Sequence, residues 1–192
     1  MKICFATNNQ NKIEEIAAAI SSAISLQSLE DIGCSEELEE TKMTLEGNSL
    51  QKARYVFDNY NVAVFADDTG LEVESLNGEP GVKSARYAGD QRDNEANIDL
   101  LLSNLQGKKN RSAQFRTVIT LIVEGKEVQF EGIAKGVIEE YRKGNAGFGY
   151  DAVFTPEGYN RTFAQMSVAE KNQISHRGLA VKKLVEYLNN QY

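Results

Sequence analysis

The sequence predicts a single α/β domain, residues 1–192, with a mixed, twisted central sheet flanked by helices. Three observations support this class. Apolar runs typical of buried strands alternate with segments whose apolar residues recur every three or four positions, as in amphipathic helices. The middle of the chain is rich in β-formers and contains a glycine turn, which favours an antiparallel pair of strands. No internal repeat and no linker rich in Pro, Gly or Ser divides the chain, so one domain is expected.

The first third of the chain is expected to form a strand and two helices. KICFAT, residues 2–7, is short and apolar, as expected of a buried strand that opens the fold. A helix is expected over residues 11–24, because the isoleucines and Ala17 recur at spacings of three and four. A second helix is expected over residues 45–59, which carry a similar apolar set.

Two strands and a third helix are expected next. VAVFADD, residues 62–68, is an apolar run that stops at Asp67 and Asp68, and LEVESL, residues 71–76, is a shorter strand. A helix is predicted over residues 93–105, whose apolar side is formed by Ile98, Leu101, Leu102 and Leu105.

The remaining chain is expected to be β-rich first and helical last. Residues 114–138 predict an antiparallel pair that turns at Gly125, and a glycine-rich loop then leads into another strand near residue 154. SVAE, residues 167–170, fits a capping box, and Ser175 is suited to cap a final helix over residues 176–190.

Composition narrows the classes of function. The formal net charge is −7 and no extended basic face is evident, so a nucleic-acid polymer is not an expected partner. No apolar run approaches membrane-spanning length and no signal-peptide pattern opens the chain, so we expect a cytoplasmic protein without a membrane partner. Cys4 and Cys34 form no CxxC pair, which suits a reducing compartment. The acidic run at residues 36–40 is typical of a solvated face or a first helical turn.

Two carboxylates at the end of a predicted strand are the first candidates for chemistry. Successive side chains of a strand point to opposite faces, so one catalytic carboxylate is expected rather than a pair acting together. In open α/β sheets, ligands bind beyond the carboxyl ends of strands, where Asp67 and Asp68 are expected to lie. The alternative is that both aspartates simply begin a turn. The DxDx[TV] motif of haloacid-dehalogenase-type phosphatases is excluded, because these aspartates are adjacent.

A second candidate is the expected strand-to-helix junction ATNNQNK, residues 6–12. Backbone N–H groups at a helix N-terminus attract anions, and Lys12 adds a positive charge. The alternative is that Asn9 or Asn11 caps the helix while Lys12 is solvated. Neither a GxxxxGK[ST] nor a GxGxxG phosphate loop occurs in the sequence.

Two further segments combine aromatic and charged residues. GFGYD, residues 147–151, places Phe148 between two glycines, where it could stack on a flat ligand or belong to the core. KNQISHRG, residues 171–178, contains His176, the only histidine of the sequence, so a histidine cluster for zinc or iron is excluded. On its own, His176 is open to a structural as well as a functional interpretation.

These motifs resemble one family in their combination and order. The motifs are TNNQNK, EET, ADDTGLEV, GEPGVKSARYAG, GFGYD and EKNQISHRG. Together they resemble the inosine triphosphate pyrophosphatase family, and the likeness runs from residue 2 to about residue 185. The resemblance implies that family's α/β fold, with an active-site cleft between two lobes. It also implies hydrolysis of ITP, dITP and XTP to the monophosphate and pyrophosphate, with Mg²⁺ as cofactor, by a homodimer.

The resemblance further implies a role for each matching residue. Asp68 would accept a proton from the attacking water and bind magnesium, and Glu40 would be the other metal-side carboxylate. The residues implied to bind the triphosphate are Thr7, Asn9, Lys12 and Lys52, and further substrate-binding residues are Asn8, Gln10, Asn11 and Thr69. The residues implied to line the purine pocket are Phe148, Gly149, Tyr150 and Asp151. Those implied to read the base and complete the phosphate site are Lys171, His176 and Arg177. Ser84 and Arg86 are additional candidates for the same pocket.

The match leaves two other functions open. One is a pyrophosphatase for other nucleotides, and the other is a nucleotide-binding sensor without turnover. Retention of both Asp68 and Glu40 speaks against the sensor. The chain departs from the family's common residues at Asn8, Gly47 and Ala152, and Gly47 stands where a glutamate near the metal side is common.

Overall fold

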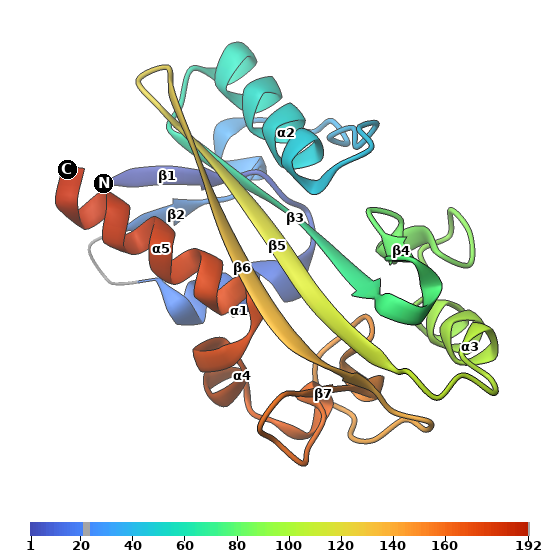
Figure 1. Ribbon diagram of the computed structural model, residues 1–192. Helices are drawn as coiled ribbons and strands as arrows, with labels where there is room; N and C mark the ends of the chain where they lie inside the picture. Colours follow the sequence, from blue (N-terminus) through green and yellow to red (C-terminus); the bar gives the residue numbers. More distant parts are fainter. Residues whose placement is uncertain (21–23, 192) are drawn as a thin grey trace.

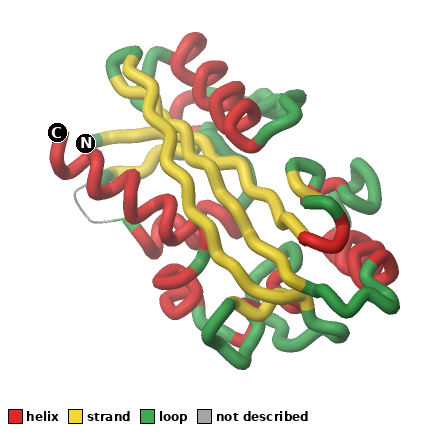
Figure 2. The backbone as a smooth tube through the Cα atoms, in the orientation of Figure 1, coloured by secondary structure: helices red, strands yellow, loops and turns green. Residues whose placement is uncertain are grey.

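The computed structural model describes residues 1–20 and 24–191 and confirms the predicted class, an α/β domain built on a mixed, strongly curled sheet (Figures 1 and 2). The strands are β1 (Lys2–Phe5), β2 (Ser25–Gln27), β3 (Val64–Val73), β4 (Pro80–Gly81), β5 (Ser112–Val123), β6 (Lys126–Ile138) and β7 (Phe154–Pro156). The helices are α1 (Gln10–Ala19), α2 (Leu45–Tyr60), α3 (Asn94–Asn104), α4 (Val168–Ile174) and α5 (His176–Gln191).

The sheet has the order β2-β1-β3-β5-β6-β7, and β4 pairs with β3 beside this path. Strand β1 runs parallel to β2 and β3, whereas the pairs from β3 to β7 are antiparallel. Helix α2 packs on one face, and α1 and α5 cover the other (Figure 1). The two long strands β5 and β6 run the length of the molecule and join its two ends (Figure 2).

Separate apolar clusters at the two ends of the long strands divide the molecule into lobes. At the first end, β1 and the start of β3 are packed between α2 on one face and α1 and α5 on the other, and we call this part the first lobe. At the second end, the last residues of β3 pack with α3, β7 and the 3-10 segment Phe163–Gln165, and we call this part the second lobe. The space between the lobes is where the predicted site residues lie.

Strand β3 corrects the prediction of two strands at 62–68 and 71–76. It is one strand, Val64–Val73, paired residue by residue with β5 from Val64 to Val73, so Asp67 and Asp68 lie in its middle rather than at its end. Glycine at position 70 leaves room for β4 beside this continuous strand, because a Cβ there would lie only 2.7 Å from the Gly81 carbonyl oxygen. The turn interpretation of the two aspartates is therefore wrong.

Other predicted elements are confirmed with shifted bounds. Helix α1 ends at Ala19, where Ile20 becomes extended, and residues 21–23 of the predicted helix lie outside the described residues. The short strands β2 and β4 were not predicted, because three and two residues carry too little periodicity. The capping box of Ser167 and Glu170 is confirmed at α4, and Ser175 Oγ accepts from the Gly178 N–H in the first turn of α5.

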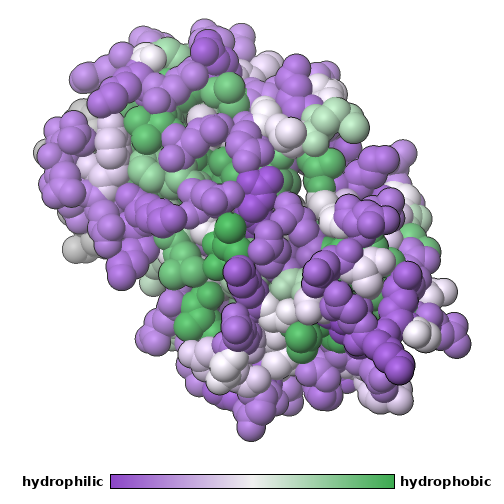
Figure 3. All heavy atoms as spheres, in the orientation of Figure 1, coloured by the Kyte–Doolittle hydropathy of each residue, from purple (hydrophilic) through white to green (hydrophobic). Residues whose placement is uncertain are grey.

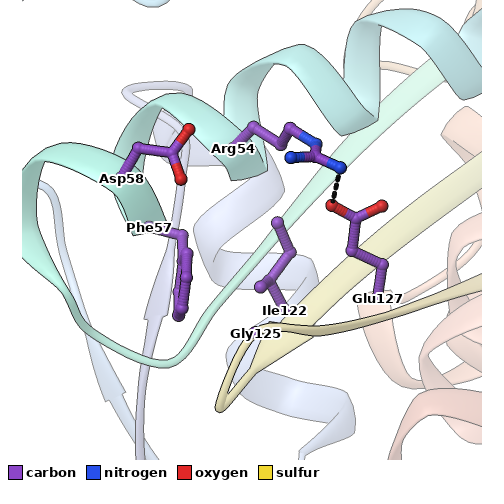
Figure 4. Close-up of a pocket in the computed structure, with 6 residues that line it drawn as sticks. All are labelled: Arg54, Phe57, Asp58, Ile122, Gly125 and Glu127. Atoms are coloured by element: carbon purple, nitrogen blue, oxygen red, sulfur yellow. Dashed lines mark ion pairs between the residues drawn. The ribbon is translucent and has the colours of Figure 1, made fainter.

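The predicted turn at Gly125 is a tight hairpin that packs near α2. Glu124 and Gly125 both have positive φ, 51° and 77°, as the favoured two-residue hairpin turns require. Beyond the turn, Arg54 of α2 and Glu127 of β6 face each other and form an ion pair of 2.6 Å (Figure 4). This contact lies in a small surface pocket of about 300 Å³, whose lining residues do not include the predicted site residues.

The molecular surface carries no sign of a membrane-spanning element within the residues that the structure describes. None of the described helices combines the length and the apolar character needed to cross a bilayer. On the face shown in Figure 3, hydrophilic side chains predominate and hydrophobic residues gather in separate groups.

Gly132 of β6 lets the start of α5 lie directly against the sheet. A Cβ at this position would collide with the backbone of His176 and would lie 2.6 Å from the Ala180 nitrogen. We expect Gly132→Ala to lower the free energy of unfolding by about 1–3 kcal/mol, because backbone atoms cannot swing aside. Denaturant unfolding measures this, with Lys135→Ala on an exposed position of the same strand as control. Equal midpoints for the two variants would contradict the close approach.

Candidate active site

A cavity of about 620 Å³ lies between the lobes and is lined by residues of both. Every residue that the resemblance implies for the site lines this cavity except Gln10 and Arg86. The predicted lining residues are Glu40, Asp68, Thr7, Asn8, Asn9, Asn11, Lys12, Lys52, Thr69, Phe148, Gly149, Tyr150, Asp151, Lys171, His176 and Arg177. Gln10 instead begins α1 on its exposed side, where its Nε2 donates to Glu14 Oε1 at 3.4 Å. The structure therefore gathers the predicted carboxylates and cations in one cleft.

The two adjacent aspartates of β3 point to opposite faces of the sheet, as strand geometry requires. Asp67 is buried and accepts from Lys12 Nζ at 2.9 Å and from Arg177 Nε at 3.2 Å. Burial alone would raise the pKa of Asp67, but the charges of Lys12, Arg177 and Lys52 outweigh it and hold the pKa below its usual range. Asp67 is thus a fixed negative charge that anchors two cations.

Asp68 faces the cavity and has few partners. Its Oδ2 accepts from Asn48 Nδ2 at 3.0 Å, and its Oδ1 accepts from the Thr69 N–H at 2.9 Å. Burial raises the pKa of Asp68, and the nearby charge of Glu40 adds to this, against the lowering effect of Lys52 and Lys12. A carboxylate with a raised pKa and an open side is suited to accept a proton.

Lys52 of α2 links the Glu40 carboxylate to the backbone of β3. Its Nζ donates to Glu40 Oε1 at 2.5 Å and to the Asp67 carbonyl oxygen at 2.7 Å. Burial alone would lower the pKa of Lys52, but the charges of Glu40, Asp68 and Asp67 raise it, so the ammonium is retained. Glu40 also accepts from Arg86 Nη2 at 3.4 Å, which brings Arg86 to the edge of the site.

The N-terminus of α1 opens into the cavity. Asn9 is the cap, since its Oδ1 accepts from the Lys12 N–H at 3.3 Å, and the Asn9 N–H donates to Thr7 Oγ1 at 3.2 Å. The capping interpretation is therefore confirmed for Asn9, but the accompanying idea of a solvated Lys12 is wrong, because Lys12 pairs with Asp67. Burial lowers the pKa of Lys12, with the charges of Lys52 and Arg177 acting in the same direction.

Glu15 of α1 is a functional candidate that the sequence did not reveal. It is buried, and its two carboxylate oxygens accept from Lys171 Nζ at 2.5 Å and from Arg177 Nη1. Lys171 also donates to Asp151 Oδ2 at 2.6 Å. Burial alone would raise the pKa of Glu15, but the charges of Arg177 and Lys171 lower it. Glu15 does not line the cavity, so it acts on the site by holding two cations that do.

Aromatic side chains form the other end of the cavity. The Phe148 ring lies 5.2 Å from Lys171 Nζ and 5.6 Å from Arg177 Cζ, which places it over both cations. The Phe148 N–H donates to Asp151 Oδ2 at 3.0 Å, and the Tyr150 hydroxyl donates to the Ser84 carbonyl oxygen at 2.7 Å. The half-buried Phe148 ring is therefore free to stack on a flat ligand, whereas Tyr150 is a buried structural member of the wall.

His176 combines a structural contact with an unused polar atom. Its ring stacks on Phe115, with centroids 4.5 Å apart, and the side chain is 3% exposed. Burial and the charges of Arg177 and Lys171 lower its pKa well below the usual value, so the imidazole is neutral at pH 7. Among the side chains that the structure describes, its Nδ1 is one of two buried polar atoms without a hydrogen-bond partner.

Several lining residues were missed because nothing in their local sequence marks them. They come mainly from two segments, residues 35–38 of the first lobe and residues 85–94 of the second, and include Arg92. Gly47, where the resemblance would place a glutamate, lies in the first turn of α2, and a Cβ there would be 2.7 Å from Lys42 Cβ. A side chain at position 47 therefore requires the preceding loop to move.

The arrangement has two chemically different ends. Carboxylates with neighbouring cations suit a polyphosphate and a divalent metal, whereas Phe148, His176 and two anchored cations suit a planar polar ring. The comparisons with known proteins agree with such a site. The Ham1 family model matches residues 3–187. The chain belongs to the Ham1 family.

Two curated relatives of this Ham1 chain carry the same name. A protein of Flavobacterium psychrophilum named dITP/XTP pyrophosphatase is 54% identical over 190 residues, covering 99% of this chain and 100% of the relative. A Bacillus subtilis protein of the same name is 43% identical over 187 residues, covering 95% and 94%. The resemblance drawn from the motifs is confirmed by these matches.

Solved structures of the Ham1 family confirm the fold. The Staphylococcus aureus Ham1 protein superposes with a TM-score of 0.91 at 37% identity and covers the whole of both chains. A Coxiella burnetii HAM1 protein gives a TM-score of 0.91 at 32% identity, covering 99% of each chain.

Proposed function

We propose that this protein hydrolyses the deaminated purine nucleotides dITP, ITP and XTP to the monophosphate and pyrophosphate. The observation that carries the proposal is one cavity with Asp68, Glu40, Lys12 and Lys52 toward one end and the Phe148 ring over Lys171 and Arg177 toward the other. Relatives named dITP/XTP pyrophosphatase, at up to 54% identity, support the same substrate class.

In the proposed reaction, Asp68 is the proton acceptor. Water adds to the α-phosphorus, its proton passes to Asp68, and the bond from the α-phosphorus to the bridging oxygen breaks, so that pyrophosphate leaves with the bonding electrons. Phosphoryl chemistry depends mainly on positioning and charge neutralisation. Lys12 and Lys52 supply positive charge on the first-lobe side, where the α1 N-terminus also opens into the cavity.

We propose Mg²⁺ as the cofactor, with Asp68 and Glu40 as its protein ligands. The donor set fits, because Mg²⁺ commonly takes one or two carboxylates and completes its shell with water and substrate phosphates. Over residues 1–20 and 24–191, no group of three or more acidic, His or Cys side chains is arranged to hold a metal alone. When bound, the ion would neutralise charge on the phosphates; Lys52 would hold Glu40 in place for it.

Base selection is proposed to use donors at the aromatic end. Hypoxanthine and xanthine carry an acceptor oxygen at position 6, where adenine has an amino group. Lys171 has used two of its three donors, on Glu15 and Asp151, and Arg177 has used three of its five, on Asp67, Glu15 and Thr69. Both keep donors for the base, and a site built on such bonds rejects a mismatched partner by as much as ~10⁴.

The assembly and location follow from the same proposal. We propose that the protein is a homodimer and that it is located in the cytoplasm. The two free, buried cysteines, Cys4 and Cys34, suit that reducing compartment. Light scattering on the purified protein tests the dimer.

A substrate panel tests the proposed function. With Mg²⁺ present, we expect pyrophosphate release from ITP, dITP and XTP, and much slower release from ATP, GTP, dTTP and UTP. Preference for another nucleotide would instead identify a pyrophosphatase of different specificity. Release of orthophosphate would contradict the proposed bond, and binding without any product would identify a sensor.

A further inference from the structure

Arg92 is a cavity cation that the proposed reaction leaves without a role. It lies in the turn between the 3-10 segment Ser84–Arg86 and α3, and its Nη2 donates to Glu37 Oε1 at 3.2 Å. Its charge acts on Glu40, so Arg92 lies toward the carboxylate end of the cavity. Arg92 belongs to the second lobe, whereas Lys12 and Lys52 belong to the first.

The ion pair of Arg92 differs from those of the other cavity cations. Lys12, Lys171 and Arg177 pair with carboxylates that are at most 7% exposed. Glu37 is 82% exposed and Arg92 is 46% exposed. A pair so open to solvent contributes little, and Glu37 returns to water at small cost when it is released. Among the cavity-lining lysines and arginines that the structure describes, Arg92 therefore has the most readily exchanged partner.

The backbone fixes the position from which Arg92 reaches the cavity. Its φ is +54°, a left-handed conformation that is uncommon outside glycine and is maintained by surrounding structure. The Arg92 N–H donates to the Gly89 carbonyl oxygen at 3.4 Å, and the next residue, Asp93, caps α3 by accepting from two backbone N–H groups. The side chain thus starts from a helix terminus rather than from an unrestrained loop.

We propose that Arg92 exchanges Glu37 for the terminal phosphates of the bound nucleoside triphosphate and holds the pyrophosphate part of the substrate. This inference rests on the proposed function. A triphosphate presents more negative charge than one carboxylate, and the planar guanidinium can bind phosphate oxygens through two hydrogen bonds. The phosphates are then held from both lobes, by Arg92 on one side and by Lys12 and Lys52 on the other.

Two variants distinguish this exchange from a structural ion pair. Arg92→Gln is expected to raise the KM for dITP about tenfold with kcat within about twofold, the low end for loss of a charged hydrogen bond. Glu37→Gln is expected to lower the KM by about two- to threefold, because Arg92 no longer has a competing partner. In the double variant the Glu37→Gln effect should vanish. If both single variants raise the KM, the pair merely ties the lobes together and the inference is wrong.

Calorimetry with inorganic pyrophosphate gives a readout independent of turnover. We expect Arg92→Gln to weaken pyrophosphate binding about tenfold and to leave dIMP binding unchanged. Arg54→Gln should change neither, because Arg54 is exposed, pairs with Glu127 and does not line the cavity. Unchanged pyrophosphate affinity in Arg92→Gln would overturn the inference. If the wild type releases no pyrophosphate from any nucleotide, the proposed function fails, while this titration still decides the role of Arg92.

Discussion

Asp68→Asn is expected to reduce the rate of pyrophosphate release from dITP by a factor of ~10²–10⁴ or more, since a positioned general base usually contributes that much. Asparagine has nearly the same shape, but its amide cannot take the proton of the attacking water. The variant should fold, because the side chain faces the cavity and its hydrogen-bond partners within the described residues are Asn48 and the Thr69 N–H. Steady-state rates at saturating dITP and Mg²⁺, with a thermal unfolding curve for each protein, measure both effects.

Asp67→Asn is the matched control, because the same change one residue away acts on the opposite face of β3. Asp67 is the buried partner of Lys12 and Arg177, and its loss leaves two cations without their shared carboxylate. We expect this variant to lose about 3–5 kcal/mol of stability, the usual cost of removing one partner of a buried ion pair. Near-wild-type turnover in Asp68→Asn would show that another group accepts the proton.

The sequence predicted helices and strands well where the apolar residues repeat over a long segment. It predicted them less well where contacts with residues distant in the sequence decide the structure. Helices α2 and α3 lie within one or two residues of their predicted bounds, since both have a capping side chain and a repeating apolar side. Strand β3 was divided in two, because the charges at Asp67 and Asp68 suggest exposure. Both carboxylates are buried by side chains distant in the sequence, including Arg177, which no local pattern could indicate.

The order of the motifs predicted which residues form the candidate site. It did not predict the buried ion pairs that hold those residues in place. Residues 148–151 of the GFGYD motif and His176 and Arg177 of the SHRG motif line one cavity with Asn9, Asn11 and Lys12 near the α1 N-terminus, as the resemblance implied. Glu15 escaped notice because it falls on the side of α1 opposite Ile13 and Ala17, where periodicity predicts solvent. In the structure Ala17 is exposed and Glu15 is buried, because Lys171 and Arg177 approach from a segment more than 150 residues away.

Glu15→Gln is expected to lower the free energy of unfolding at pH 7 by about 3–5 kcal/mol, because Lys171 and Arg177 lose the carboxylate they share in the protein interior. The loss should depend on pH. The pKa of Glu15 is lowered from its ordinary value of 4.5 in the folded protein, so its ionised form stabilises the fold above that pH. As the pH falls below about 4.5 and then through the folded-state pKa, the wild type loses this contribution and the two proteins converge. Denaturant unfolding between pH 7 and pH 3 measures the difference.

Glu14→Gln provides the control for charge alone, since Glu14 is the exposed neighbour and bonds only Gln10 among its described side-chain partners. We expect it to change stability by less than about 0.5 kcal/mol.

The KM for dITP should also rise in Glu15→Gln, because Lys171 and Arg177 then lose one of the carboxylates that position them and keep Asp151 and Asp67. A stability difference that stays constant down to pH 3 would mean that Glu15 is not the ionised partner of these cations. If the stability difference shrinks at low pH but the KM is unchanged, Glu15 stabilises the fold and base recognition does not depend on it.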